Sequence, residues 1–317
     1  MKNTRLRHAE YYGMTEIFDS LYERSTKGEK FTNLMNIIMS EDNILLAYRN
    51  IKRNNGGATP GIDKVTIKDI EKLDTDEFIQ TVHKRFNRYN PRKVRRIEIP
   101  KPNGKTRPLG IPSMWDRIAQ QCILQVLEPI CEPKFYKHSF GFRPNRSAEN
   151  AVSICAQRIN LLKMQYVVDV DIKGFFDEVK HTKLMRQIWT LGIRDKQLLV
   201  ILRKMLKAPI QMPNGTTVYP TKGTPQSGIL SPLLANINLN EFDWWIAGQW
   251  ESFQCREIND YYNKVTGLMS HSYRYKQLRK TSGLKEMYIV RYADDFKIFA
   301  RTRAEASQIF IASRMWL

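Results

Sequence analysis

The spacing of apolar residues along the chain predicts helices mixed with antiparallel hairpins. Apolar positions recur every three or four residues, as on one face of a helix, in segments 15–24, 31–51, 118–130, 147–162, 184–191, 195–205 and 304–317. Short apolar or alternating runs, typical of strands, occupy segments 94–111, 166–172, 210–218 and 288–300. Asn-Gly turns divide the first and third of these runs, which predicts hairpins there. The whole pattern indicates an α+β fold.

Polar residues mark the expected starts of three helices, at Asp116, Ser147 and Asp195, where a side-chain oxygen can cap the first turn. The helix after Ser147 is expected to bury an apolar face made of Val152, Cys155, Ile159 and Leu162. The polar, aromatic-rich segment 244–275 has no clear periodicity, so no element is predicted for it.

Two adjacent carboxylates, Asp294 and Asp295, interrupt the last strand-like segment. The apolar runs on either side predict a hairpin with both acids at its tip. Like charges held together are unfavourable unless a cation neutralises them, and carboxylate oxygens suit Mg²⁺. An ordinary polar turn is the alternative, because Asp is a common turn residue.

Segment 166–172 has the composition of a buried strand, yet it carries Asp169 and Asp171 at alternate positions on one face. A buried carboxylate must be paired or bind a metal ion. The sequence therefore predicts a second acidic constellation here, with Phe175 and Phe176 following it.

The charge of the chain indicates a polyanionic partner, because a formal net charge of +19 repels itself otherwise. The excess is clustered: residues 84–107 contain ten Lys and Arg residues against one acid, and a second basic run spans 274–291. Lys101 and Arg107 flank the turn of the first hairpin, where they could hold a triphosphate. A solvated basic hairpin is the alternative. The candidate RNA-binding residues are Arg92, Lys93, Arg95 and Arg96, together with Arg143 and Arg146 beside aromatic residues.

The pattern of cysteines predicts a reducing compartment, and the lengths of the apolar runs predict no membrane span. The four Cys residues form no CxxC pair, so neither a zinc site nor a disulfide framework is predicted. No apolar run reaches membrane-spanning length, and no signal-peptide pattern is present. The cytoplasm, most simply that of a bacterium, is the expected location, with no membrane partner and an organelle as the alternative.

An ordered set of motifs resembles the reverse transcriptases, in particular those of group II intron-encoded maturases. The set comprises the Asn- and Gly-rich loop 54–61, the basic hairpin segment 99–112, the Ser-Phe-Gly-Phe-Arg-Pro segment 139–144, the Asp-bearing strand 166–172 with Phe-Phe-Asp 175–177, the Thr-Pro-Gln-Ser-Gly turn 224–228 with Leu-Leu-Ala-Asn-Ile 233–237, and Tyr-Ala-Asp-Asp 292–295. The resemblance covers roughly residues 31–300, and such an ordered set is far more specific than any one motif.

The resemblance implies a right-hand polymerase fold, with helical and hairpin fingers, a palm whose antiparallel sheet is flanked by helices, and the thumb absent. It implies an N-terminal helical extension at 1–30, mainly fingers at 31–165, and mainly palm at 166–317, ending before the thumb. Within the palm range, a fingers hairpin is expected near 209–220 and a basic insertion near 245–286.

The resemblance also implies roles for single residues. Asp171 matches the first catalytic aspartate, Asp294 and Asp295 match the pair in the palm hairpin, and the expected metal site consists of these three with Ile172. Phe176 matches the residue beneath the sugar, Lys101 and Arg107 match the residues that hold the incoming triphosphate, and Gln226 matches the residue near the nascent base pair. Ser227 stands where the family more often has Gly.

The implied function is RNA-directed DNA polymerisation with two Mg²⁺ ions and dNTP substrates. The expected partners are an RNA template, a DNA primer and intron RNA, whose splicing and retrohoming the protein would assist. An RNA-binding splicing cofactor that does not polymerise, or a retron-type reverse transcriptase, are the alternatives. The sequence leaves the oligomeric state open, with a homodimer as one alternative.

Overall fold

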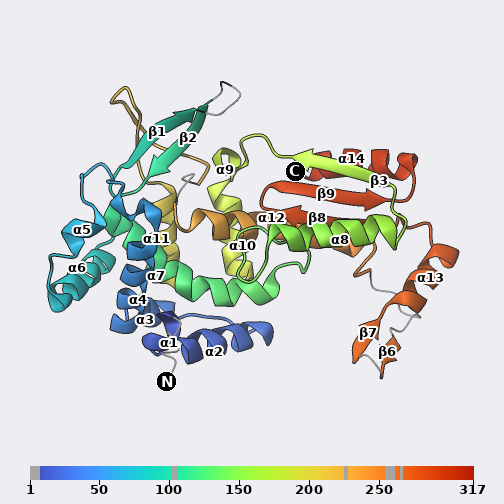
Figure 1. Ribbon diagram of the computed structural model, residues 1–317, viewed down its shortest axis with the longest axis horizontal. Helices are drawn as coiled ribbons and strands as arrows, with labels where there is room; N and C mark the ends of the chain where they lie inside the picture. Colours follow the sequence, from blue (N-terminus) through green and yellow to red (C-terminus); the bar gives the residue numbers. More distant parts are fainter. Residues whose placement is uncertain (1–7, 101–103, 105, 225–227, 254–260, 265–266) are drawn as a thin grey trace, which may run out of the picture. The chain divides into compact units, whose positions relative to one another are not determined.

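The computed structural model describes the whole chain except residues 1–7, 101–103, 105, 225–227, 254–260 and 265–266 (Figure 1). The described residues form two compact units, each assembled from two separate stretches of sequence. The first unit contains residues 1–135 and 174–238, and the second contains residues 136–173 and 239–317. Helices and antiparallel strands occur in both units, so the predicted α+β class is confirmed.

The first unit is mainly helical and is centred on α7 (Met114–Cys131), against which α2, α3, α4 and α6 pack. Ile118, Cys122 and Val126 of α7 are completely buried, which explains the long apolar periodicity of this segment. The helix elements of this unit are α1 (His8–Tyr11), α2 (Thr15–Thr26), α3 (Leu34–Ile38), α4 (Glu41–Arg53), η1 (Asn55–Ala58), α5 (Ile67–Ile70), α6 (Thr75–Asn87), α7, η2 (Glu132–Lys134), α9 (Phe175–Glu178), α10 (His181–Thr190) and α11 (Lys196–Leu206).

The start of α7 differs from the prediction. Ser113, rather than Asp116, caps the helix, because the Ser113 side chain accepts a hydrogen bond from the Asp116 backbone N–H. The Asp116 carboxylate accepts from the Ser113 hydroxyl in return. The predicted caps Ser147 and Asp195 are confirmed, since each accepts from a backbone N–H in the first turn of its helix.

A four-stranded sheet in the first unit has the order β2-β1-β4-β5. Its strands are β1 (Val94–Pro100), β2 (Thr106–Ile111), β4 (Ile210–Gln211) and β5 (Thr217–Val218), so both predicted hairpins are confirmed. The β1–β2 register pairs Ile97 with Leu109 and Ile99 with Arg107. Because cross-strand partners point to one face, apolar side chains and Arg107 share a face of this hairpin.

The second unit is built on a three-stranded antiparallel sheet with the order β3-β9-β8. Its elements are α8 (Ala148–Asn160), β3 (Tyr166–Asp171), β6 (Tyr261–Asn263), β7 (Leu268–Ser270), α13 (Ser272–Thr281), β8 (Tyr288–Tyr292), β9 (Asp295–Ala300) and α14 (Arg303–Trp316), and α12 (Ser231–Gln249) ends within it. Helix α8 packs against β8, whereas α14 packs against β3 and β9 (Figure 1). Phe296 and Ile298 on the core face are completely buried.

The prediction that strand β3 is buried is wrong, and the predicted buried face of α8 is wrong in part. Strand β3 is only half-buried, and its acidic face is exposed to solvent rather than enclosed. Of the face predicted for helix α8, Cys155 and Leu162 pack against the core, whereas Val152 and Ile159 are 66% and 43% exposed. The helix buries Ala151 and Arg158 instead of these two. Segment 244–275, for which the sequence predicts no element, contains the end of α12, the β6–β7 pair and the start of α13. None of the helices in the described ranges combines the length and apolar content needed to cross a membrane.

Candidate active site

The hairpin formed by β8 and β9 turns at Ala293 and Asp294, as the sequence predicts. Ala293 has a φ of +58°, in the left-handed region that residues with a Cβ atom rarely adopt. Asp294 is half-buried in the turn, and Asp295 is exposed as the first residue of β9. The strained turn therefore holds both acids at one end of the sheet.

Asp171 and Asp295 are direct cross-strand partners in the β3–β9 ladder. Asp171 is the last residue of β3, so two carboxylates 124 positions apart in sequence meet at the same end of the sheet. Directly opposed residues have Cβ atoms about 4.5–5.5 Å apart and point to one face. The convergence of Asp171 with the hairpin tip, on which the predicted catalytic site depends, is thus present.

Lys297 lies beside these acids on the same face of the sheet, since it pairs with Asp169 in the ladder. Its Nζ donates to Oδ1 of Asp169 at 2.7 Å and to Oδ1 of Asp295 at 3.3 Å. The hydrogen bond to Asp169 is the main reason that the pKa of Lys297 is raised. Asp169 is therefore neutralised by an ion pair, which leaves Asp171 and Asp295 as the carboxylates opposed to each other.

The donor atoms at this end of the sheet are carboxylate oxygens, the ligands of hard divalent cations. Within the described ranges, no group of three or more His, Cys, Asp or Glu side chains is arranged to hold a metal ion. Mg²⁺ is commonly bound through one or two protein carboxylates, with water and substrate phosphates completing its shell. The Asp171–Asp295 pair fits a cation of that kind. The side chain of Ile172 packs against the core, so this residue could offer only its main-chain carbonyl.

A buried ion pair supports the turn from the core side of the sheet. The Arg291 guanidinium donates to both carboxylate oxygens of Asp243, at 2.6–3.0 Å, and these side chains are 1% and 0% exposed. Arg291 Nη1 also donates to the carbonyl of Ala293 at 2.7 Å. Burial raises the pKa of Asp243, and the Arg291 charge opposes that shift. The strained residue of the turn is consequently tied to helix α12 through a charge-assisted network.

Gly141 brings a second segment against the same turn. The backbone of residues 138–140 forms a parallel bridge with Arg291, through hydrogen bonds from Arg291 N to His138 O and from Phe140 N to Arg291 O. A Cβ atom at Gly141 would lie 2.2 Å from the Ala293 nitrogen. Only glycine therefore permits this approach, which explains the Gly within the Ser-Phe-Gly-Phe-Arg-Pro segment.

The residues expected to bind the nucleotide belong to the first unit or fall outside the described ranges. Lys101 and Gln226 lie outside them. Arg107 is exposed on β2, opposite Ile99. Phe176 is half-buried in α9, next to the buried Phe175, whose ring centroid is 5.5 Å away.

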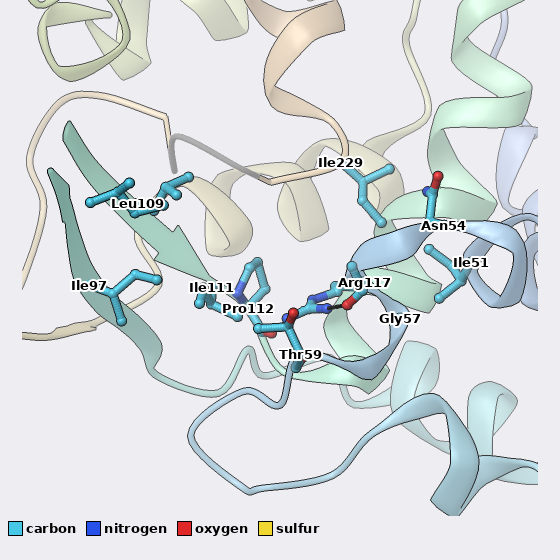
Figure 2. Close-up of a pocket in the computed structure, with 12 residues that line it drawn as sticks. Ile51, Asn54, Gly57, Thr59, Ile97, Leu109, Ile111, Pro112, Arg117 and Ile229 are labelled. Carbon is cyan, nitrogen blue, oxygen red and sulfur yellow. Dashed lines mark hydrogen bonds between the residues drawn. The ribbon is translucent and has the colours of Figure 1, made fainter. Parts of the chain in front are cut away.

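A pocket of about 570 Å³ adjoins the β1–β2 hairpin (Figure 2). Its apolar wall comes from Ile97 and Leu109 on the strands and from Ile51 and Ile229 (Figure 2). The Arg117 guanidinium at its base is already used, because it donates to the carbonyls of Gly56, Thr59 and Pro112. The pocket thus suits an uncharged group, and Arg107 shares the hairpin face that lines it.

The family model described as "Reverse transcriptase (RNA-dependent DNA polymerase)" matches residues 99–317, which is more than half of the chain. This chain is a reverse transcriptase family member. The matched residues include both acidic segments of the site. The resemblance to group II intron-encoded reverse transcriptases is confirmed by the relatives.

Two curated relatives match most of this reverse transcriptase chain. "Protein YkfC" of Escherichia coli (strain K12) is 31% identical over 88% of this chain and 74% of its own length. "Group II intron-encoded protein LtrA" of Lactococcus lactis subsp. cremoris is 33% identical over 88% of this chain. The chain spans only 50% of LtrA. A solved structure, "Partial Cas6-RT-Cas1--Cas2 complex", aligns at 20% identity and a TM-score of 0.47, covering 88% of this chain and 40% of that one.

The predicted RNA-binding residues of this reverse transcriptase differ in how far they reach solvent. Arg92 and Lys93 are exposed before β1, whereas Arg95 and Arg96 are half-buried within it, and Arg95 donates to the Pro60 carbonyl. Arg143 is buried, and its Nη1 donates to the carbonyls of Tyr136 and Ser139. Arg146 is half-buried and donates to the Lys137 carbonyl.

The structure does not support an RNA contact by Arg143, because its guanidinium is enclosed and engaged with the backbone. Arg291 likewise belongs to the core, although the sequence placed it at the end of a basic run. The one signal that could have revealed its role is Asp243, an acid within the apolar and aromatic sequence of α12. A buried acid of that kind requires a cationic partner.

Proposed function

We propose that this chain carries the nucleotidyl-transfer site of an RNA-directed DNA polymerase of the group II intron kind. The observation that carries the proposal is the cross-strand pairing of Asp171 with Asp295 at the tip of the Tyr-Ala-Asp-Asp hairpin. An ordinary polar turn needs no acid from another strand, so this pairing favours the catalytic alternative. Membership of the reverse transcriptase family supports the same reaction.

In this proposal Asp171 and Asp295 bind divalent cations, with Asp294 and the Ile172 carbonyl as further ligands. When bound, two Mg²⁺ ions would supply activation of the primer 3′-hydroxyl and neutralisation of the triphosphate and the leaving pyrophosphate. Lys297 holds the Asp295 carboxylate by a hydrogen bond and offsets the repulsion between the two opposed acids. The buried Arg291–Asp243 pair keeps the turn in the conformation that presents both acids.

The nucleotide-binding roles follow from chemistry and from the resemblance. Arg107 would donate to the triphosphate of a dNTP, together with Lys101. The apolar pocket on the Arg107 face of the hairpin would accommodate a base (Figure 2). Phe176 would contact the sugar, and Gln226 would lie near the nascent base pair.

We also propose a right-hand polymerase organisation for this chain. Residues 31–165 would be mainly fingers and residues 166–317 mainly palm, after an N-terminal extension at 1–30. The support is the three-stranded sheet with acids at one end, flanked by α8 and α14, which is the arrangement expected of a palm. The basic hairpin β1–β2 would belong to the fingers.

The exposed cations support binding of intron RNA as a second activity, through which the protein would assist splicing and retrohoming. Arg92 and Lys93 are exposed, and the net charge of +19 favours a polyanion. If the acids served only as a scaffold, the chain would be a splicing cofactor that does not polymerise. Replacement of Asp171 should then spare RNA binding and splicing assistance, whereas replacement of Arg92 and Lys93 should reduce both.

Primer extension on an RNA template tests the catalytic proposal. Asp171→Asn and Asp295→Asn should each lower the extension rate by roughly 10³-fold or more, because each removes a carboxylate that would hold the metal ions against the reacting phosphates. Asp169→Asn is the matched control: Asp169 lies on the same strand and face, but it pairs with Lys297. Its rate should stay within a few fold of the parent chain. Equal losses in all three variants, or activity retained in Asp171→Asn, would refute the proposal.

A further inference from the structure

A second pocket lies in the first unit, between α10 and α11, with a volume of about 730 Å³. One face of each helix lines it. Arg186 and Trp189 are three residues apart on α10, while Arg203 and Lys207 are four residues apart at the end of α11. Residues at these spacings project from the same side of a helix. Met185, His181 and Leu199 add a largely buried floor.

Three cations converge on this pocket without compensating acids. Arg186, Arg203 and Lys207 are exposed, and their side chains have no hydrogen-bond or ion-pair partner in the part of the chain that the structure describes. No carboxylate occurs among the described lining residues. Many other cations of the chain are paired, as Lys222 is with Glu178 and Lys52 with Glu71. Cations that line one pocket without neighbouring carboxylates favour the binding of an anionic ligand.

Trp189 gives the pocket an aromatic surface beside these cations. Its side chain is 42% exposed, so part of the indole ring is accessible to a ligand. The guanidinium carbon of Arg194 lies 5.0 Å from the ring centroid, so a cation stacks on the ring and helps to fix it. A fixed, partly exposed indole next to free cations is the combination that binds a base and its phosphate together.

We propose that this pocket binds one nucleotide unit of a single-stranded RNA, with its base on Trp189 and its phosphates on Arg186, Arg203 and Lys207. The site uses neither the carboxylates of the sheet nor the basic residues at 92–96, so it is an additional RNA contact. It does not depend on polymerisation. A free nucleotide offers the same base and phosphate, and the experiment below separates the two sources.

The test measures binding of a fluorescent 20-nucleotide uridine-rich RNA to the whole chain by anisotropy at several salt concentrations. Trp189→Ala should weaken binding roughly 5- to 100-fold, whereas Trp189→Phe should retain most of the affinity because it keeps an aromatic face. The logarithm of the binding constant falls linearly with the logarithm of the salt concentration. The triple variant Arg186→Gln, Arg203→Gln, Lys207→Gln should reduce the magnitude of this salt slope by about 0.7 for each phosphate that the variant no longer neutralises. Thermal denaturation of Trp189→Ala shows whether the variant is folded.

Matched controls make the outcome decisive. Lys196→Gln removes the same charge as Lys207→Gln from the other end of α11, outside the pocket, and should leave the affinity nearly unchanged. RNA affinity is measured without primer extension, so a failure of the catalytic proposal leaves this test of the pocket unaffected. RNA carrying 4-thiouridine should cross-link within residues 181–207. The proposal would be overturned if the pocket variants and Lys196→Gln bound the RNA with equal affinities and equal salt slopes. It would also be overturned if Trp189→Ala weakened the binding of ATP but left the binding of RNA unchanged, because the site would then bind a free nucleotide.

Discussion

Gly141→Ala should displace the turn that carries Asp294 and Asp295. The new Cβ atom would lie 2.2 Å from the Ala293 nitrogen and 2.9 Å from its Cα, whereas ordinary contacts begin at 3.4 Å. Both neighbours are backbone atoms, so neither can rotate away as a side chain would. Relief of the clash requires a separation of about 1 Å between the two segments, and the hydrogen bonds of Phe140 and Arg291 resist that separation.

The structure predicts both a loss of stability and a loss of activity from this single methyl group. Forcing extra volume into a packed region costs about 1–3 kcal/mol of unfolding free energy. A displacement of about 1 Å at reacting groups lowers a rate by roughly 10²-fold. Urea denaturation measures the first effect, and primer extension on an RNA template measures the second under conditions where the variant is folded.

Gly248→Ala is the matched control in the same unit. A Cβ atom at Gly248 would meet nothing within 4 Å, and the position lies inside α12, where Ala is favoured over Gly by up to about 1 kcal/mol. This variant should be as active as the parent chain and at least as stable. If Gly141→Ala matched Gly248→Ala in both assays, the proposed support of the turn by residues 138–141 would be wrong.

Two further predictions concern buried charges near the site. Asp243→Ala should lower the free energy of unfolding by about 3–5 kcal/mol in urea denaturation, because the Arg291 charge stays buried and unpaired. A loss below about 1 kcal/mol would contradict the supporting role of the ion pair. Burial lowers the pKa of His138 from its usual 6.5 to about 4, and its Nε2 lies 2.9 Å from Nη2 of Arg158, a contact that suits the neutral ring. Since the unfolded chain takes up this proton first, stability should be intact above pH 6.5 and fall by about 3 kcal/mol as the pH drops to 4. His138→Gln should have a shallower loss over that range, and parallel curves for the two proteins would exclude His138 as the cause.

The sequence by itself determined the elements and the chemistry of the site. Apolar periodicity located the helices and hairpins, because burial of one face imposes a period of 3.6 or 2 on the residues. The acids stood out because carboxylates are costly within apolar strand-like runs. The order of the motifs identified the family before any contact was known. These signals are local, and local signals are readable along a chain.

Only the tertiary structure decided which acids meet and what supports them. The register of β3 on β9 opposes Asp171 to Asp295 and pairs Asp169 with Lys297, and a shift of one residue would have sent these side chains to the other face. In the sequence Arg291 is indistinguishable from a surface cation, and only its pairing with Asp243 in the core shows that it is buried. Gly141 was one glycine among sixteen until the Ala293 backbone was placed against it. Long-range register and burial depend on partners distant in sequence, and a one-dimensional pattern does not specify those partners.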